Sequence, residues 1–169
     1  WYLRPRTEIV TVTVPATSSV APLPSSPPSS PPSSPPTPEQ EREALLARAG
    51  TARLEWAKNA KDPASKEATG DVVWNAAEQR GYMRFRGLAK NDKRASVYQL
   101  WIFDKTRDDQ YPVDGGVFDV EDETGDVIVP IKAKLPVGEV ALFAVTVEKP
   151  GGVVVSKRER IVVTAKPAS

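Results

Sequence analysis

The sequence predicts an all-β protein, an antiparallel β-sandwich of about eight strands preceded by one short helix. Beyond Gly50, apolar residues recur at every second position in a series of short segments, as in strands that turn one face toward a core. Turn-forming sequences, DETG at 122–125 and PGG at 150–152, separate some of these segments. This combination is typical of two packed antiparallel sheets, and we assign residues 51–166 to the sandwich domain.

The segment before the sandwich, residues 38–50, is predicted to be the helix. Thr37 can cap its first turn, Pro38 suits the first helical position, and Gln40 completes a capping box. Gly50 can end the helix, because glycine accepts the left-handed conformation found there. About 12 residues are marginal for an isolated helix, so we expect it to pack against the domain that follows.

The most apolar segment, VYQLWIFD at 97–104, is predicted to be a central strand. Alternate residues of a strand point to opposite faces, and both faces of this one are largely apolar. One face belongs to the core, and the other needs a cover or forms an aromatic shelf for a ligand. We expect the helix to cover Trp101 and Phe103. The core face would hold Tyr98, Leu100 and Ile102, and the other Val97, Gln99, Trp101 and Phe103.

Two later segments, 115–121 and 125–135, flank the turn DETG and are expected to form a hairpin. Pro130 has no N–H group for a strand partner, which favours a sheet edge or a bulge at its position. The alternation in every segment predicts one core between the two sheets. Its expected members are Leu54, Trp74, Phe85, Leu100, Ile102, Phe118, Val129, Phe143, Val145 and Ile161.

Two further segments lie N-terminal to the helix. Residues 15–37 are rich in proline, and SSPPSSPPSSPP at 25–36 repeats a four-residue unit three times. This composition lacks the apolar surface of a core and favours the polyproline conformation, so we interpret 15–37 as a disordered Pro/Ser-rich spacer. Residues 1–14 begin WYLRPR, and aromatics followed by arginines commonly flank a transmembrane helix. We therefore interpret 1–14 as a juxtamembrane segment and expect a transmembrane helix before Trp1. The alternative, from these six residues alone, is that the sequence starts here at an arbitrary point.

Composition argues against several classes of function. The net charge of +1, from 23 basic and 22 acidic residues, gives no overall attraction to nucleic acid, and we expect no nucleic-acid partner. The chain has no cysteine and no histidine. Thiolate nucleophiles, the usual catalytic triad and most zinc and copper sites are therefore excluded. We expect no enzymatic activity, no catalytic, cofactor-binding or metal-binding residues, and no cofactor.

An acidic stretch is the strongest candidate for a metal site. Asp119, Glu121 and Glu123 alternate before Gly125, as carboxylates do in a calcium loop. The position of the bidentate glutamate is occupied by Pro130, however, and a solvated turn explains the same residues. We favour the solvated turn.

A local basic run is the strongest candidate for an anion-binding patch. Tyr82 shares a strand face with two of the arginines, but charges on the exposed face of an antiparallel strand are ordinary. We therefore favour a solvated face over a binding site. The run consists of Arg80, Arg84, Arg86, Lys90, Lys93 and Arg94.

Five short motifs occur in the order found in the extracytoplasmic C-terminal domain of anti-sigma-K factors, which this chain resembles over residues 51–166. YQLW and FAVTVEKPGG are the more specific of them. The chain departs from the family pattern at Leu88–Ala89, where the family usually has Leu-Pro, and after the paired glycines. The motifs are GDVVW at 70–74, RGL at 86–88, YQLWIFD at 98–104, GGVFDV at 115–120 and FAVTVEKPGG at 143–152.

The resemblance implies a regulatory domain on the outer side of a bacterial single-pass membrane protein. A cytoplasmic region outside this chain would bind an extracytoplasmic-function sigma factor, and a regulatory protease would release that factor in response to external signals. The resemblance supplies no catalytic residues. The alternative is a cell-surface adhesion or carbohydrate-binding sandwich that shares the same scaffold, because a fold does not determine a function.

Overall fold

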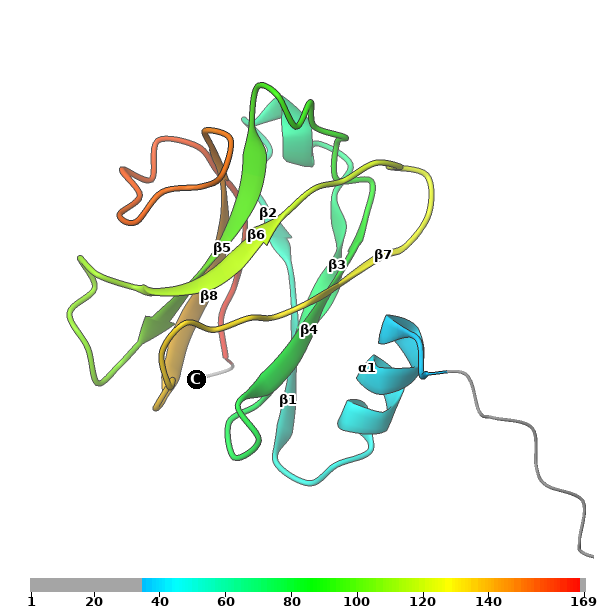
Figure 1. Cartoon of the computed structure of the whole chain (residues 1–169), viewed down its shortest axis with the longest axis vertical. Helices are drawn as coiled ribbons and strands as arrows, with labels where there is room; N and C mark the ends of the chain where they lie inside the picture. Colours follow the sequence, from blue (N-terminus) through cyan, green and yellow to red (C-terminus); the bar gives the residue numbers. More distant parts are fainter. Residues whose placement is uncertain (1–34, 168–169) are drawn as a thin grey trace, which may run out of the picture. The chain divides into compact units, whose positions relative to one another are not determined.

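Two antiparallel sheets lie face to face in the computed structural model of the chain, which describes residues 35–167 (Figure 1). The predicted β-sandwich is therefore confirmed, with nine strands in the described residues rather than about eight. One sheet has the order β1-β3-β4-β7, formed by Thr51–Glu55, Thr69–Asn75, Arg80–Arg86 and Val127–Pro130. The other has the order β2-β9-β8-β5-β6, formed by Ala57–Lys58, Ile161–Ala165, Val140–Glu148, Val97–Asp104 and Val113–Phe118.

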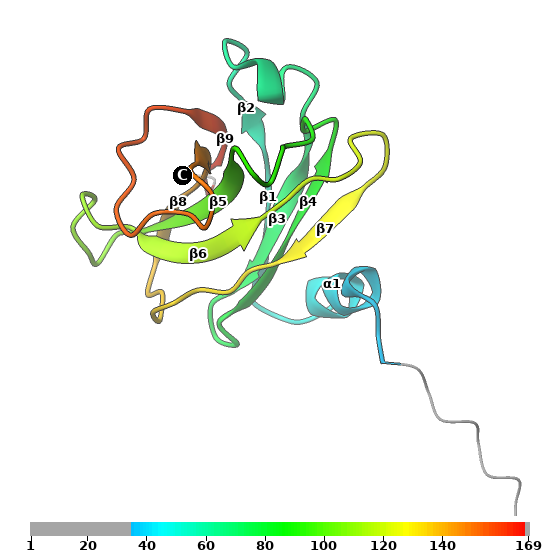
Figure 2. The ribbon, with the colours of Figure 1, turned by 45° about the horizontal axis from the view of Figure 1, so that its top comes forward.

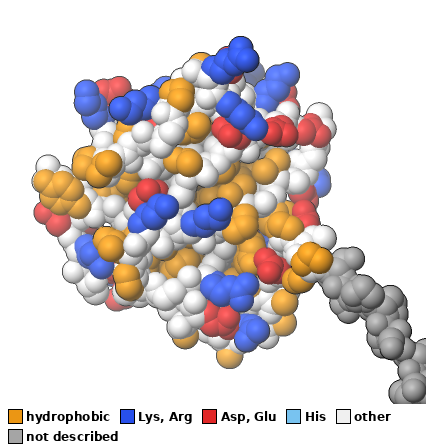
Figure 3. Space-filling model, in the orientation of Figure 1, with side chains coloured by type: hydrophobic (Ala, Val, Ile, Leu, Met, Phe, Trp, Pro, Cys, Tyr) orange, Lys and Arg blue, Asp and Glu red, His pale blue; other side chains and the backbone are white. Residues whose placement is uncertain are grey.

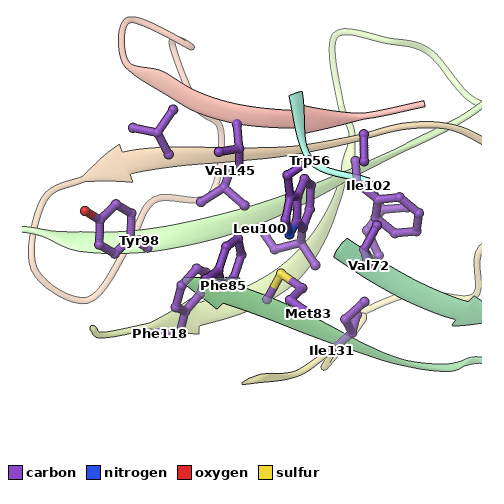
Figure 4. Close-up of a cluster of buried hydrophobic side chains, with 14 of the residues drawn as sticks. Trp56, Val72, Met83, Phe85, Tyr98, Leu100, Ile102, Phe118, Ile131 and Val145 are labelled. Atoms are coloured by element: carbon purple, nitrogen blue, oxygen red, sulfur yellow. The ribbon is translucent and has the colours of Figure 1, made fainter. Parts of the chain in front are cut away.

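A row of stacked aromatic rings fills part of the core between the sheets (Figure 4). Trp56, where the chain passes from β1 to β2, stacks on Phe85 with ring centroids 5.3 Å apart. Phe85 stacks in turn on Phe118, also at 5.3 Å, and Phe118 stacks on Tyr98 at 5.5 Å. Because these rings come from both sheets, the row ties the two layers together.

Most of the expected core residues lie in this core. Val129 is half-buried at its margin, as suits the short edge strand β7. Ile161 is an exception, because it packs with Trp101 and Phe103 on the outer face of the five-stranded sheet. The others are buried in the core as predicted: Leu54, Trp74, Phe85, Leu100, Ile102, Phe118, Phe143 and Val145.

The predicted hairpin around DETG is wrong. Strand β6 pairs with β5, whereas β7 pairs with β4, so the turn leads from one sheet to the other. A turn signal between two alternating segments does not distinguish a hairpin from a change of sheet, since both need the same local chemistry. Pro130 does lie where expected, at the end of the edge strand β7.

The helix packs on the other sheet from the one expected. α1 spans Pro38–Leu46, and its capping box is present, with Thr37 N–H donating to Gln40 Oε1 at 2.9 Å. Leu45 packs against Val73, Tyr82 and Ile128 on the outer face of the four-stranded sheet, where Figure 2 shows α1.

Trp101 and Phe103 are buried under a different cover. Val153 and Ile161, from the connection between β8 and β9 and from β9 itself, pack against them. The guanidinium carbon of Arg158 lies 5.0 Å from the centre of the Phe103 ring. The strand is therefore covered on both faces, as its apolar composition predicts, and these two rings form no open shelf.

The N-terminal predictions lie outside the described residues. They concern the juxtamembrane segment 1–14 and the spacer up to residue 34. Among the described residues, no helix combines the length and the apolar character that crossing a membrane requires.

Candidate functional site

The acidic residues weighed as a calcium loop each have another partner. Asp119 accepts a hydrogen bond from Asn91 Nδ2 at 2.7 Å, and Glu121 forms an ion pair with Lys93. Glu123 accepts a hydrogen bond from the Lys90 N–H group. In the part of the chain that the structure describes, no three acidic side chains converge on a point that could hold a metal ion.

Residues of the basic run form ion pairs with several different carboxylates. Arg86 pairs with Asp126 at 2.8 Å, Lys93 pairs with Glu121, and Arg84 pairs with Asp71 at 2.7 Å. On the face shown in Figure 3, lysine and arginine side chains alternate with acidic ones and form no continuous basic surface. The basic run is therefore partly paired with carboxylates.

Asp71 is a fully buried carboxylate that several charged side chains contact. Its side chain is 0% exposed, on the outer face of the four-stranded sheet beside α1. Arg42 of α1 donates to Oδ1 at 2.5 Å, while Arg53 Nη2 and Arg84 Nη2 lie 2.8 and 2.7 Å from Oδ2. Three elements, α1, β1 and β4, therefore meet on one carboxylate.

The environment of Asp71 keeps this carboxyl ionised. Burial raises its pKa, but the hydrogen bond and positive charge of Arg42, the charge of Arg84 and the hydrogen bond from Arg53 together lower it below its ordinary value. A buried charge requires this kind of compensation, because an unpaired carboxylate away from water costs several kcal/mol. Asp71 and Arg42 thus attach the helix to the sheet.

A groove of about 320 Å³ lies on the same outer face. Three arginines line it, and Arg53 and Arg84 are two of those that hold Asp71. Gly70 forms part of the lining with a φ of +137°, and a Cβ there would overlap the carbonyl oxygen of Arg84. The complete lining is Arg53, Glu55, Trp56, Thr69, Gly70, Arg84, Arg86 and Asp126.

A second depression, of about 730 Å³, lies over the outer face of the five-stranded sheet. The buried side chain of Gln99 organises it, since Nε2 donates to Val153 O at 3.0 Å and Oε1 accepts from Val153 N at 2.9 Å. The Gln99 amide therefore makes two hydrogen bonds to the backbone of one residue in the connection between β8 and β9, as the backbone of a paired strand does. Three exposed valines border the depression: Val117, Val154 and Val155.

Comparison with known protein families gives a match over residues 9–157 to the family described as "Anti-sigma-K factor rskA, C-terminal". The chain belongs to the anti-sigma-K factor C-terminal family. Neither the curated proteins nor the solved structures contain a match. Membership gives the chain a regulatory role in an anti-sigma factor and a sigma factor as the partner of that protein, and the family is typically membrane-associated.

The GDVVW and RGL motifs of this anti-sigma-K factor domain shape the four-stranded sheet. Gly70 and Asp71 supply the groove lining and the buried carboxylate, and Trp74 packs edge-on against Phe143 in the core. Gly87 has a φ of +71°, and a Cβ there would overlap the carbonyl group of Glu67. Both glycines are therefore required by the backbone rather than by a ligand.

The YQLW and PGG motifs of the anti-sigma-K factor domain act together. The Tyr98 hydroxyl donates to Ala89 O at 2.7 Å, and Trp101 Nε1 donates to Thr146 Oγ1 at 2.9 Å. Gln99 holds Val153, and Gly152, with a φ of +78°, lets the chain turn above Gln99. These residues stabilise the five-stranded sheet and its covering loop.

Proposed function

We propose that this chain is the extracytoplasmic regulatory domain of a single-pass bacterial membrane anti-sigma factor. In this proposal a cytoplasmic region of the same protein binds an extracytoplasmic-function sigma factor, and regulated proteolysis releases that factor. The family match over residues 9–157 is the observation that carries the proposal, because it spans part of the N-terminal segment, the Pro/Ser-rich stretch and most of the sandwich.

The composition of the first residues supports a position close to a membrane. WYLRPR combines two aromatics with two arginines, residue types that favour the headgroup region and its aqueous border. The Pro/Ser-rich stretch then suits a spacer that holds a folded domain away from the bilayer. These features support the proximity to a membrane in the proposal, and the extracytoplasmic side follows from the family resemblance alone.

The proposed role requires no catalysis, and the buried acidic groups fit a structural role. A general acid at neutral pH needs a raised pKa. Burial raises the pKa of Asp104, but hydrogen bonds from the Gly138 backbone, the Thr106 backbone and side chain and the Glu139 backbone lower it to about 2. The pKa of Asp71 is lowered as well. Both carboxylates remain ionised and tied to their partners.

Sigma-dependent transcription in cells that produce the complete anti-sigma factor tests the proposal. Leu100→Asp places a charge in the core, at a side chain that is 0% exposed, and should unfold the sandwich. We expect this variant to change the amount of cleaved anti-sigma factor and the transcription from a sigma-dependent promoter.

Leu135→Asp is the matched control, because Leu135 is 52% exposed. It should behave like the unchanged protein in both measurements. The proposal fails if the complete protein binds no sigma factor, or if Leu100→Asp unfolds the sandwich and leaves both cleavage and transcription unchanged.

A further inference from the structure

We propose that the groove lined by Arg53, Arg84 and Arg86 binds a small acidic carbohydrate. The recognised unit would be one carboxylate or phosphate group with hydroxyl groups beside it. The groove volume of about 320 Å³ lies at the lower end of the range of about 300–1,000 Å³ found for small-molecule sites.

The three arginines offer unused donors to the groove. Their side chains are 52, 32 and 64% exposed, in the order Arg53, Arg84, Arg86. Asp71 accepts hydrogen bonds from Nε of Arg53 and Nη2 of Arg84, and Nη2 of Arg53 forms an ion pair with it. Asp126 accepts a hydrogen bond from Nε of Arg86. Among the described residues, the Nη1 group of each arginine has no hydrogen-bond partner. Guanidinium groups bind carboxylate and phosphate oxygens through pairs of such donors.

Asp71 holds two of these guanidinium groups in place from beneath. Arg53 and Arg84 lie 2.8 and 2.7 Å from the same oxygen of Asp71, whose side chain is 0% exposed. A side chain already fixed in this way loses little rotamer freedom when a ligand binds, which reduces the entropic cost of association. The buried carboxylate therefore prepares the arginines for an anion.

The charge of the lining selects the kind of anion. Three arginines face two lining carboxylates, Glu55 and Asp126. The charge of the buried Asp71 is shared with Arg42, which also pairs with the exposed Glu43. A single anionic group is attracted by this balance, whereas the two carboxylates repel a polyanion such as nucleic acid. Glu55, Asp126 and the hydroxyl of Thr69 can accept hydrogen bonds from sugar hydroxyls beside the anion.

Titration of the 169-residue chain with three sugars, followed by ¹H–¹⁵N NMR, tests the proposal. The probes are D-glucuronate, glucose 1-phosphate and glucose, which differ in the anionic group. We expect glucuronate, glucose 1-phosphate or both to shift the amide signals of Thr69, Gly70 and Arg84, and salt to weaken the effect. A response to one acidic sugar alone identifies which anion the groove takes.

Two arginine variants on β4 separate the groove from general charge attraction. Arg86→Gln removes a charge that lines the groove, and Arg80→Gln removes one from the same face of the strand near α1. We expect Arg86→Gln to weaken binding of the responding sugar about tenfold or more and Arg80→Gln to leave it unchanged.

The proposal is overturned if neither acidic sugar shifts these amides, if glucose binds as well as they do, or if Arg80→Gln weakens binding as much as Arg86→Gln. The titration involves no sigma factor, membrane or protease. A negative titration therefore does not contradict the proposed regulatory function. Likewise, evidence against the regulatory function does not contradict a positive titration.

Discussion

Asp71 joins three elements on the outer face of the four-stranded sheet, because arginines of α1, β1 and β4 share its carboxylate. Replacing it by Asn keeps the size of the side chain but removes the negative charge that three arginines share. Arg42 is 4% exposed and would then keep only the exposed Glu43 as a carboxylate partner, with the buried Nη2 group left unpaired. We expect Asp71→Asn to lower the free energy of unfolding by about 3–5 kcal/mol, measured by denaturant titration at pH 7.

Asp126→Asn is the matched control for this prediction, since Asp126 pairs with the exposed Arg86 and is itself 36% exposed. Its effect should stay within about 1 kcal/mol. Equal effects of the two variants would contradict the assignment of Asp71 as a buried anchor.

Acid should abolish the difference between the unchanged chain and Asp71→Asn. Because the pKa of Asp71 is lowered in the folded state, its contribution is complete above the ordinary carboxyl pKa of 3.8. The contribution is lost as the pH falls through the lowered value, where the folded state also takes up a proton. Unfolding free energies of both chains, measured from pH 7 downward, should therefore converge below pH 3.8. A constant difference across that interval would contradict the predicted ionisation.

The groove could not be predicted from the sequence, because its key contacts depend on register. An aspartate at the start of a strand normally indicates an exposed position, and the partners of Asp71 lie 29, 18 and 13 residues away. These separations carry no local signal. Alternation predicts that Arg84 lies on the same face as Tyr82, but its contact with Asp71 depends on the register of β3 with β4, which the sequence does not show.

At the scale of elements, alternation predicts which segments are strands and, apart from Ile161, which of the expected side chains enter the core or its margin. It did not predict which sheet receives each strand, because every segment shows the same period of two. Both sheets also have an apolar patch on the outer face: Val73 and Tyr82 on one, Trp101 and Phe103 on the other. The sequence therefore does not show on which of these two patches α1 packs.

The attachment of α1 is expected to depend on Leu45, which is 2% exposed. Leu45→Asp would place a charge against Val73 and Tyr82, so the helix should leave the sheet and lose its amide protection in hydrogen exchange. Strands β5 and β8 should keep their protection. Ala44→Asp, on the exposed side of the same helix, is the control and should exchange like the unchanged chain. Retained protection of α1 in Leu45→Asp would show that Leu45 is not the anchor.

The connection between β8 and β9 provides a matched pair of glycines. Gly151 and Gly152 have φ values of +83° and +78°, so alanine at either position should cost about 1–2 kcal/mol in backbone strain. A Cβ at Gly152 would also lie 2.7 Å from Val117 Cγ1 and 2.8 Å from Gln99 Oε1, whereas Gly151 has open space. Thermal unfolding should therefore show Gly152→Ala to be the less stable variant. Equal melting temperatures would contradict the close packing of this loop over Gln99.

At the scale of the whole molecule, the composition of the Pro/Ser-rich stretch bears on how the sandwich would control cleavage under the proposed function. A proline-rich spacer transmits little force or twist, so access to a cleavage site is a better mechanism than a relayed change of shape. LRPRTEIVTVTV at 3–14 is rich in β-branched residues, which a protease can bind as an added strand. A ligand or partner on the sandwich would then block or expose this segment.

Limited proteolysis of the complete anti-sigma factor, with the new chain ends mapped by mass spectrometry, tests this control by access most directly. The first cuts should fall within residues 3–14, while the sandwich from Thr51 onward stays intact because its strands are paired in two packed sheets. Replacing residues 7–14 by a protease-resistant sequence should also block release of the sigma factor. First cuts inside residues 51–166, or normal signalling after that replacement, would contradict the proposed mechanism.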